Sequence, residues 1–511
     1  MYSNFTDLRP GRFAKHLPLV SALVLNPFAV AFVFAFMSLA VSIFSIHYGL
    51  SMIIMSMPFM SYYLERNLLE RILIPPFSCV VIWEALGSGL GVAFIVYGNG
   101  GGFDPYLLRV QIVTLLCVPF GWFFYRLGFG VIPRMTFPEI RSRFDLDVVR
   151  PLVWVGWFFL LYQVFRTIVL AKTGALDRGD FGLIAMDAKS FGIWSYFNLF
   201  PRFNSFAFFL FPLFFQRSSV FGKAIGLGLL GVYFLIALVS GSRGIVFFPV
   251  IFIVVGLYFF RSLKNAKLDV WGVVLMIVML PLVVFIDAYR NTDAYRATST
   301  LDIVGRIRAL DDGYEKLISA DENITDIEGR NYVTLGSALL GVMDSLVYQL
   351  TPAGIPYAGF EGFNAIPYTF VPTFIKRDKP LLLDSNPILW RYTGRIDRTG
   401  KAMSLPADAY RRFGWFGVLP VVALFFWIYG LLCGKCYRIY LSKDALWGIL
   451  LILFLLSFIQ SRPFGTILET WWHFSYNLSK HLVVLYIGYW GLKKILSIRG
   501  RGGAIQYGGR Q

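Results

Sequence analysis

Long apolar segments recur along almost the whole chain and constrain its fold more than any other feature. The runs at 245–260 and 445–458 are almost continuously apolar, without the alternation of polar and apolar residues that marks an outer-membrane barrel strand. Only 15% of the 511 residues are charged, whereas about a quarter are charged in a soluble domain. Because backbone groups stay paired in lipid only within helices or closed barrels, the sequence predicts an all-α polytopic membrane protein.

Segments of about 17 to 25 apolar residues, long enough to cross a bilayer, can be placed at about twelve positions. They are 27–46, 49–64, 72–96, 107–126, 150–171, 191–215, 223–240, 244–260, 269–287, 414–434, 445–461 and 473–491. The expected organisation is a cytoplasmic segment 1–26, a bundle of about nine helices over 27–287, one large loop over 288–413, about three last helices over 414–491, and a cytoplasmic tail over 492–511. The Gly- and Arg-rich end of that tail, from Arg499, is expected to be disordered.

The distribution of positive charge predicts the orientation. The net charge is +17, and most basic residues lie in short loops that alternate with basic-poor loops such as 97–105, as the positive-inside rule requires. Both termini are therefore predicted to be cytoplasmic and the 288–413 loop to be external, which in a bacterium means periplasmic. Since the basic residues are spread over inter-helix loops, nucleic acid is not an expected partner.

One segment of the large loop, 332–350, is apolar enough to resemble a further span, although it carries Asp344. A crossing there would invert every later loop and move Lys493, Lys494 and Arg499 to the outside, against the positive-inside rule. We therefore expect an interfacial or re-entrant helix.

Charged side chains on the external side are the candidates for chemistry, because charge near lipid is costly and is rarely kept without a role. Arg243 lies in the turn 240–244 (SGSRG), which fits either an anion site or an arginine that reaches the interface. The other candidates for substrate binding are Arg290, Lys376, Arg377, Lys379, Tyr410 and Arg411. Guanidinium forks and lysine charges suit diphosphate oxygens, and the alternative is a set of charges that meet lipid headgroups.

Two residues are candidates for the proton acceptor of a reaction. Asp408 lies in the run 404–417 (SLPADAYRRFGWFG), which leads into the expected span 414–434. His473 follows Trp471 and Trp472 at the outer end of the last expected span, and it fits either a base or a neighbour of an interfacial aromatic belt.

Four short elements occur in an order that resembles a known family. They are Leu25-Asn-Pro27, the SGSRG turn, Pro372 with Lys379-Pro380, and the run from Pro406 through Asp408-Ala-Tyr410 to Phe413-Gly414 and Gly417. In this order, and with a large external loop before the final helices, the chain resembles the Wzy-type oligosaccharide repeat-unit polymerases, the bacterial family also called O-antigen polymerases.

The resemblance implies a glycosyltransferase of the bacterial inner membrane that needs no metal and no other cofactor. Its donor and acceptor would be glycans on a polyprenyl diphosphate such as undecaprenyl diphosphate, joined at the periplasmic face into a polysaccharide such as that of lipopolysaccharide. Besides membrane lipid, the resemblance allows a chain-length regulator protein as a partner. It assigns diphosphate binding to Arg243, and to Arg377 and Arg411 of the loop. Asp408 departs from the pattern, since a glutamate often precedes this tyrosine.

The resulting hypothesis is a single displacement that inverts the anomeric carbon, with charge neutralisation on the departing diphosphate and a base for the acceptor hydroxyl. Arg243, Lys376 and Arg377 would hold the diphosphate with Arg290 and Arg411, and Asp408 or His473 would receive the proton. Alternatives are an O-antigen ligase or another lipid-linked glycosyltransferase, which shares the donor, and a transporter of lipid-linked oligosaccharides, which the lack of an internal repeat disfavours.

Overall fold

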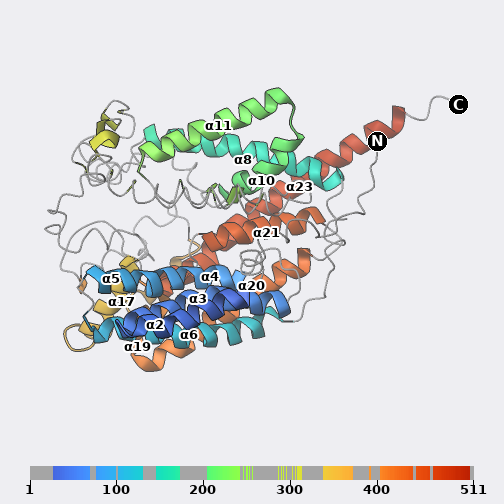
Figure 1. Cartoon of the computed structure of the whole chain (residues 1–511). Coiled ribbons are helices and arrows are strands. Elements are labelled where there is room, and N and C mark those ends of the chain that lie inside the picture. Colours follow the sequence, from blue (N-terminus) through green and yellow to red (C-terminus); the bar gives the residue numbers. More distant parts are fainter. Residues whose placement is uncertain are drawn as a thin grey trace.

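The computed structural model of the chain describes residues 27–68, 76–98, 102–130, 146–172, 204–241, 338–371, 403–440, 445–460 and 464–506, with Arg391, Tyr392 and scattered positions between 246 and 312. Within these ranges every regular element is a helix and no strand occurs. The predicted all-α class is thus confirmed for the part of the chain that the structure describes (Figure 1).

Five helices in the described ranges are long and apolar enough to cross a membrane: Pro76–Tyr97, Pro105–Phe129, Val149–Ala171, Val220–Val239 and Trp415–Ile439. They correspond to the expected spans 72–96, 107–126, 150–171, 223–240 and 414–434. Three shorter apolar helices lie at Ala31–Ser42, Phe206–Arg217 and Leu446–Leu455. The chain is therefore a helical protein with the features of a membrane protein. Most of the expected spans 244–260 and 269–287 lies outside the described residues, so the total of about twelve stays a prediction.

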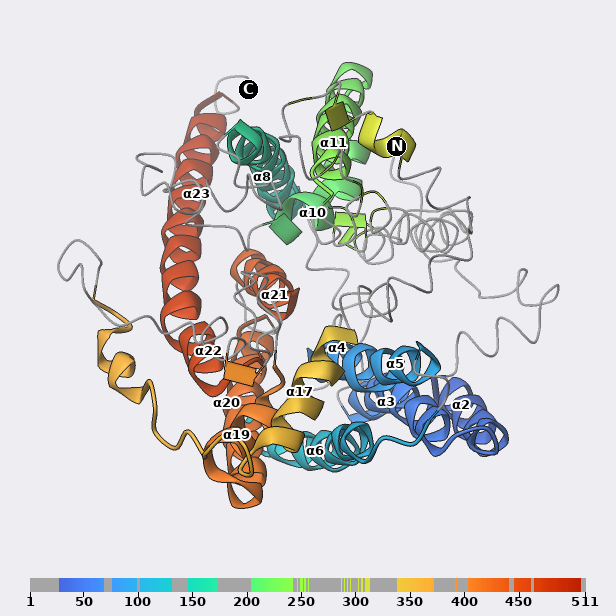
Figure 2. The same cartoon turned by 90° about the vertical axis from the view of Figure 1, so that its left-hand side faces the viewer.

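The N-terminal helices pack side by side in both views (Figures 1 and 2). They are α2 (Pro27–Ser42), α3 (Ile46–Leu68), α4 (Pro76–Glu84), the π-helix η1 (Ala85–Gly91), α5 (Val92–Gly98) and α6 (Pro105–Phe129). α4, η1 and α5 follow one another without a break, and the π-helical turn falls on the Gly-rich stretch ALGSGLG. α6 begins where Asp104 accepts hydrogen bonds from the backbone N–H groups of Tyr106 and Leu107, ahead of Pro105.

A buried carboxylate joins three of these helices. Glu65 of α3 accepts hydrogen bonds from the backbone N–H groups of Phe77 and Ser78 at 3.0 and 2.9 Å, from the Ser78 hydroxyl at 2.6 Å, and from the Tyr125 hydroxyl of α6 at 3.2 Å. The first N–H groups of a helix have no partner within it, so Glu65 satisfies the start of α4 from outside. This contact fixes where α4 begins against α3 and α6.

The remaining helices form the rest of the described structure. They are α8 (Leu146–Lys172), α10 (Asn204–Arg217), α11 (Val220–Val239), α17 (Ala338–Leu350), the 3₁₀-helix η5 (Phe363–Tyr368), α19 (Leu405–Phe413), α20 (Trp415–Tyr440), α21 (Ala445–Gln460), α22 (Ile467–Trp472), the π-helix η6 (His473–Asn477) and α23 (Leu478–Gln506). α17, the C-terminal end of α11 and α19 lie at one end of the helix array, and the C-terminal part of α23 lies at the other (Figure 1).

Two expectations about local structure can be compared with these helices. α17 covers Ala338–Leu350 of the expected segment 332–350, whose first six residues lie outside the described part of the chain, so the interfacial or re-entrant helix stays a prediction. α23 continues to Gln506, so the expectation of disorder from Arg499 is wrong as far as that residue. Extending an existing helix adds one hydrogen bond per residue fixed, whereas starting a new one is costly, and a Gly- and Arg-rich sequence can therefore continue as helix.

α6 and α20 approach each other so closely that three glycines stand at their contact. A Cβ atom added to Gly430 would overlap the carbonyl oxygen of Tyr125, and one added to Gly434 would overlap that of Phe129. From the other side, a Cβ atom on Gly128 would overlap the carbonyl oxygen of Trp427. Gly430 and Gly434 are four residues apart, the small-xxx-small spacing that lets two membrane helices bring their backbones together.

We expect Gly430→Ala to destabilise the fold by about 1–3 kcal/mol, because overpacking forces backbone shifts at this contact. The matched control is Gly228→Ala in α11, where an added Cβ atom meets open space and helix propensity alone should raise stability slightly. The measurement is the thermal midpoint of the detergent-extracted protein, followed by fluorescence-detected size-exclusion chromatography. Equal midpoints for the two variants would show that the contact is loose.

Candidate functional site

α19 is a short helix of nine residues that carries the charged side chains of Asp408, Arg411 and Arg412. Ser404 caps it by accepting a hydrogen bond from the backbone N–H of Ala407, and Gly414, with φ 65°, ends it. Asp408 lies three residues before Arg411 and four before Arg412, and on a helix residues at these spacings are neighbours. The backbone N–H of Ser404 donates to Asp344 of α17 at 3.0 Å, which joins the two helices.

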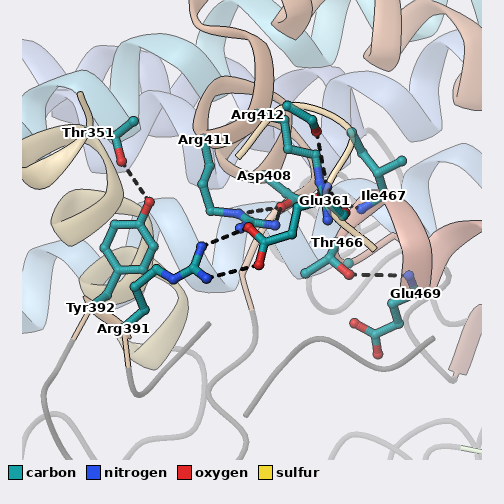
Figure 3. Close-up of polar contacts among 12 residues, drawn as sticks. Thr351, Glu361, Arg391, Tyr392, Asp408, Arg411, Arg412, Thr466, Ile467 and Glu469 are labelled. Atoms are coloured by element: carbon teal, nitrogen blue, oxygen red, sulfur yellow. Dashed lines mark hydrogen bonds and ion pairs between the residues drawn. The ribbon is translucent and has the colours of Figure 1, made fainter. Parts of the chain in front are cut away.

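Asp408 is fully buried and uses both carboxylate oxygens (Figure 3). Oδ1 accepts from Arg411 Nε at 2.7 Å, with Arg411 Nη2 also at 2.7 Å. Oδ2 accepts from Arg412 Nε at 3.1 Å and from the backbone N–H of Ile467, the first residue of α22, at 2.8 Å. A carboxylate has about four lone-pair sites, and here it accepts three hydrogen bonds, while Arg411 Nη2 is close to Oδ1 without making one.

The charges of this cluster set its electrostatics. Burial alone would raise the pKa of Asp408, but the guanidinium groups of Arg411 and Arg412 and the N–H of Ile467 lower this pKa below its ordinary value. Asp408 is therefore ionised at neutral pH. One carboxylate and two guanidinium groups leave one net positive charge in a buried setting, where charges act more strongly than in water.

Arg412 ties α19 to the loop before η5. Its Nη1 donates to the carbonyl oxygens of Gly359 at 3.2 Å and Glu361 at 2.5 Å. The backbone continues the contact, since Ala358 N–H donates to the carbonyl oxygen of Arg411 and Gly359 N–H to that of Arg412. Gly359 has φ 51°, a conformation that favours glycine. The loop and the end of α19 therefore form one unit.

An exposed ion pair lies beside this unit. Arg391 donates from Nη1 and Nη2 to the two carboxylate oxygens of Glu361 at 2.8 and 2.9 Å, a bidentate arrangement. This hydrogen bonding lowers the pKa of Glu361. Because both side chains are about half exposed, the pair contributes little to stability, at most about 1 kcal/mol.

The structure places Tyr410 in the interior of this unit. Its ring packs against Tyr348 and Trp415, and its hydroxyl donates to the carbonyl oxygen of Thr351 at 3.1 Å. The Thr351 hydroxyl in turn meets the hydroxyl of Tyr392 at 2.6 Å. Tyr410 is 4% exposed, so in this arrangement its side chain packs in the interior and stabilises the position of α19.

His473 lies at a π-helical turn just beyond α22. Thr466 caps α22 by accepting a hydrogen bond from the N–H of Glu469, and His473 opens η6 after Trp472. His473 Nε2 is 3.7 Å from Glu469 Oε1, and the Glu469 side chain is about one-third exposed. Single π-helical turns often occur at functional sites. Since Asp408 binds the first N–H of α22, the His473–Glu469 pair lies within two helical turns of the cluster on α19.

A second group of contacts gathers at the C-terminal end of α11, where the SGSRG turn begins. The hydroxyls of Tyr289 and Tyr295 donate to the carbonyl oxygens of Val239 and Ser240, both at 2.8 Å. The buried guanidinium of Arg306 stacks on the ring of Tyr295 at 3.8 Å. Tyr289 and Tyr295 thus bind the C-terminal end of α11, a few residues before Arg243.

The other basic residues expected in the site fall outside the described part of the chain: Arg243, Arg290, Lys376, Arg377 and Lys379. Of the expected residues, the structure describes Asp408, Tyr410, Arg411 and His473, and all four lie on α19 or just after α22. Among the described residues, no group of three or more His, Cys, Asp or Glu side chains gathers as metal ligands would.

Several residues of the site were not singled out from the sequence. Arg412 could have been, because its spacing of four from Asp408 on a helix is the usual one for an ion pair. Glu469 stands four before His473, and the same rule applies. Glu361 and Arg391 are separated by 30 residues, and no local pattern connects them.

Comparison of the chain with protein-family models, with curated proteins and with solved structures gives no match. The geometry described above therefore carries the functional argument together with the resemblance of the short sequence elements.

We expect Asp408→Asn to destabilise the protein by roughly 3–5 kcal/mol, since it leaves two buried guanidinium groups without their counter-charge. The control, Glu361→Gln, removes a carboxylate from an exposed pair and should cost at most about 1 kcal/mol. Thermal midpoints of the two variants in the same detergent make the comparison. A similar small loss for both would mean that Asp408 contributes no more than a surface charge.

Proposed function

We propose that this chain joins polyprenyl-diphosphate-linked oligosaccharide repeat units into a surface polysaccharide at the periplasmic face of the bacterial inner membrane. The observation that carries the proposal is the buried cluster of Asp408, Arg411 and Arg412. It lies in the same sequence run that resembles the repeat-unit polymerases, and it makes that run a rigid, positively charged element at the end of the helix array.

The arrangement of helix ends is compatible with the proposed sidedness. α19, α17 and the C-terminal end of α11 share one end of the array, and the C-terminal part of α23 lies at the other (Figure 1). We assign the first end to the periplasm and the second to the cytoplasm. Arg217 at the end of α10 and Arg438 in the last turn of α20 then lie on the cytoplasmic side, as the positive-inside rule expects.

The departing diphosphate requires positive charge that is already in place. We assign direct contact with the diphosphate to Arg243, Lys376, Arg377 and Lys379, with Arg290. Arg411 is 2% exposed and paired with Asp408, so its contribution in this arrangement is the net positive charge of the buried cluster. Low-dielectric surroundings strengthen the attraction between that charge and an anionic donor.

The acceptor hydroxyl needs a base, and the geometry favours His473 over Asp408. The oxygens of Asp408 already accept three hydrogen bonds, and its lowered pKa makes it a weak proton acceptor. His473 is buried and the Glu469 side chain is about one-third exposed, so an acceptor would reach this pair from the Glu469 side. A carboxylate beside an imidazole stabilises the imidazolium that forms when the base takes the proton. We therefore assign positioning of α19 and α22 to Asp408 and proton acceptance to His473.

A host that lacks its own polymerase tests the activity. Supplied with this chain and a matched repeat-unit pathway, it should make long glycan ladders on a gel, and Arg243→Ala should shorten them to single repeats while the protein stays in the membrane. Arg438→Ala, which removes a charge at the other end of the array, should leave the ladders unchanged. Single repeats from the unaltered chain with a matched pathway would point to a ligase or a transporter.

The role of His473 has its own test. With purified lipid-linked repeat units, His473→Gln should lower the polymerisation rate by about 10²- to 10⁴-fold, the usual contribution of a positioned base, and should remove the fall in rate on the acidic side of the pH profile. Trp472→Phe keeps an aromatic neighbour and should retain that profile. A rate within a few-fold of the unaltered protein and an unchanged profile for His473→Gln would assign this histidine to the interfacial aromatic belt.

A further inference from the structure

A pocket lies between the start of α8 and the end of α10, away from the site just described. Its volume is about 520 Å³, and it is lined by Val149, Arg150, Val153, Trp154, Trp157, Leu161 and Arg217. Arg217 is the last residue of α10, two residues before the cap of α11. The pocket therefore lies at the opposite end of α11 from the SGSRG turn. α8 and α10 lie side by side in both views (Figures 1 and 2).

The two arginines of this pocket differ from those on α19. Both side chains are exposed, and the pocket lining contains no carboxylate. In the described part of the chain neither guanidinium contacts an acidic group or another hydrogen-bonding partner. Arg411 and Arg412, in contrast, are buried and paired with Asp408. Two positive charges at the rim of one pocket suit an anion with several oxygens, such as a phosphate group.

The rest of the lining is apolar and belongs to the outer face of a candidate membrane span, Val149–Ala171. The side chains of Trp154 and Leu161 are 61% and 52% exposed, and Phe158 of the same helix is 64% exposed. A spanning helix that leaves such side chains uncovered meets acyl chains. Tryptophan is enriched where the headgroup region meets the hydrocarbon. The arginines at the helix ends match the headgroup of a lipid, and the aromatic surface beside them matches its acyl chain.

We propose that this pocket binds an anionic phospholipid. Its phosphate lies between Arg150 and Arg217, and one acyl chain lies along Trp154, Trp157 and Leu161. Basic pockets between membrane helices on the cytoplasmic side hold anionic headgroups in this manner. The apolar part of the lining distinguishes this occupant from a free phosphate ion, which would use only the two arginines. The proposal depends on the membrane character of the chain and not on its glycosyl-transfer activity.

Native mass spectrometry of the full chain in a neutral detergent tests the proposal, with phosphatidylglycerol and phosphatidylcholine of identical acyl chains as probes. Each basic residue near an anionic lipid contributes roughly a five-fold preference, so phosphatidylglycerol should bind about ten-fold or more tightly than phosphatidylcholine. The double variant Arg150→Gln/Arg217→Gln should lose this preference. The matched variant Lys435→Gln/Arg438→Gln removes two exposed charges from α20 and should keep it.

A third variant tests the apolar half of the pocket. Trp154→Ala keeps both arginines. It should weaken the binding of both lipids by about two- to five-fold, in line with the loss of a large apolar contact, and should leave the ratio of their affinities unchanged. Equal binding of the two lipids by the unaltered chain would overturn the proposal, as would equal losses in the two double variants. Displacement of the lipid by millimolar inorganic phosphate would also overturn the proposal and would assign the pocket to a small anion. Dimers that disappear with Trp154→Ala would assign the surface to a second copy of the chain.

Discussion

The end of the structure that contains α19 depends on the carboxylate of Asp408. Its three hydrogen-bond donors come from α19 itself and from the first residue of α22. Arg412 extends the network to the carbonyl oxygens of the 359–361 loop. Three segments far apart in the sequence thus meet at one buried charge. Removing a buried polar partner costs more than any single hydrogen bond stabilises, so this network favours one arrangement of these segments over others.

The hydrogen bonds to the Asp408 carboxylate also determine which part it can take in proton transfer. A group that accepts from two guanidinium ions and a helix N-terminus is well suited to hold other residues and poorly suited to exchange a proton during turnover. The cluster instead presents a fixed positive field and an oriented α22. Glu469 and His473 follow on α22 and η6, and their side chains lie 3.7 Å apart. A division between a rigid anchor and a nearby exchangeable pair is a common way to keep a reactive group in place.

The sequence predicted those parts of the fold that follow from local periodicity. Five expected spans correspond to candidate spanning helices, because apolar length and composition act within one segment. The π-helical turn in 85–91 was not predicted, and within it Gly89 packs closely against Ser51, Ile54 and Met55 of α3. Likewise, the link from Asp408 to Ile467 and the Glu361–Arg391 pair join distant segments, and no spacing rule reaches across 59 or 30 residues.

The arginines of this chain show how one residue type takes different roles in a membrane protein. On α19, arginines are buried and neutralised in part by Asp408, which keeps their charge fixed at the helix mouth. At the start of α8 and the end of α10, arginines are exposed beside tryptophan and lack an acidic partner among the described residues. In the first arrangement the protein itself offsets one of the two guanidinium charges. In the second arrangement an anion from outside the protein has to offset the charge of the two arginines. At a membrane surface the most abundant such anion is the phosphate group of a lipid.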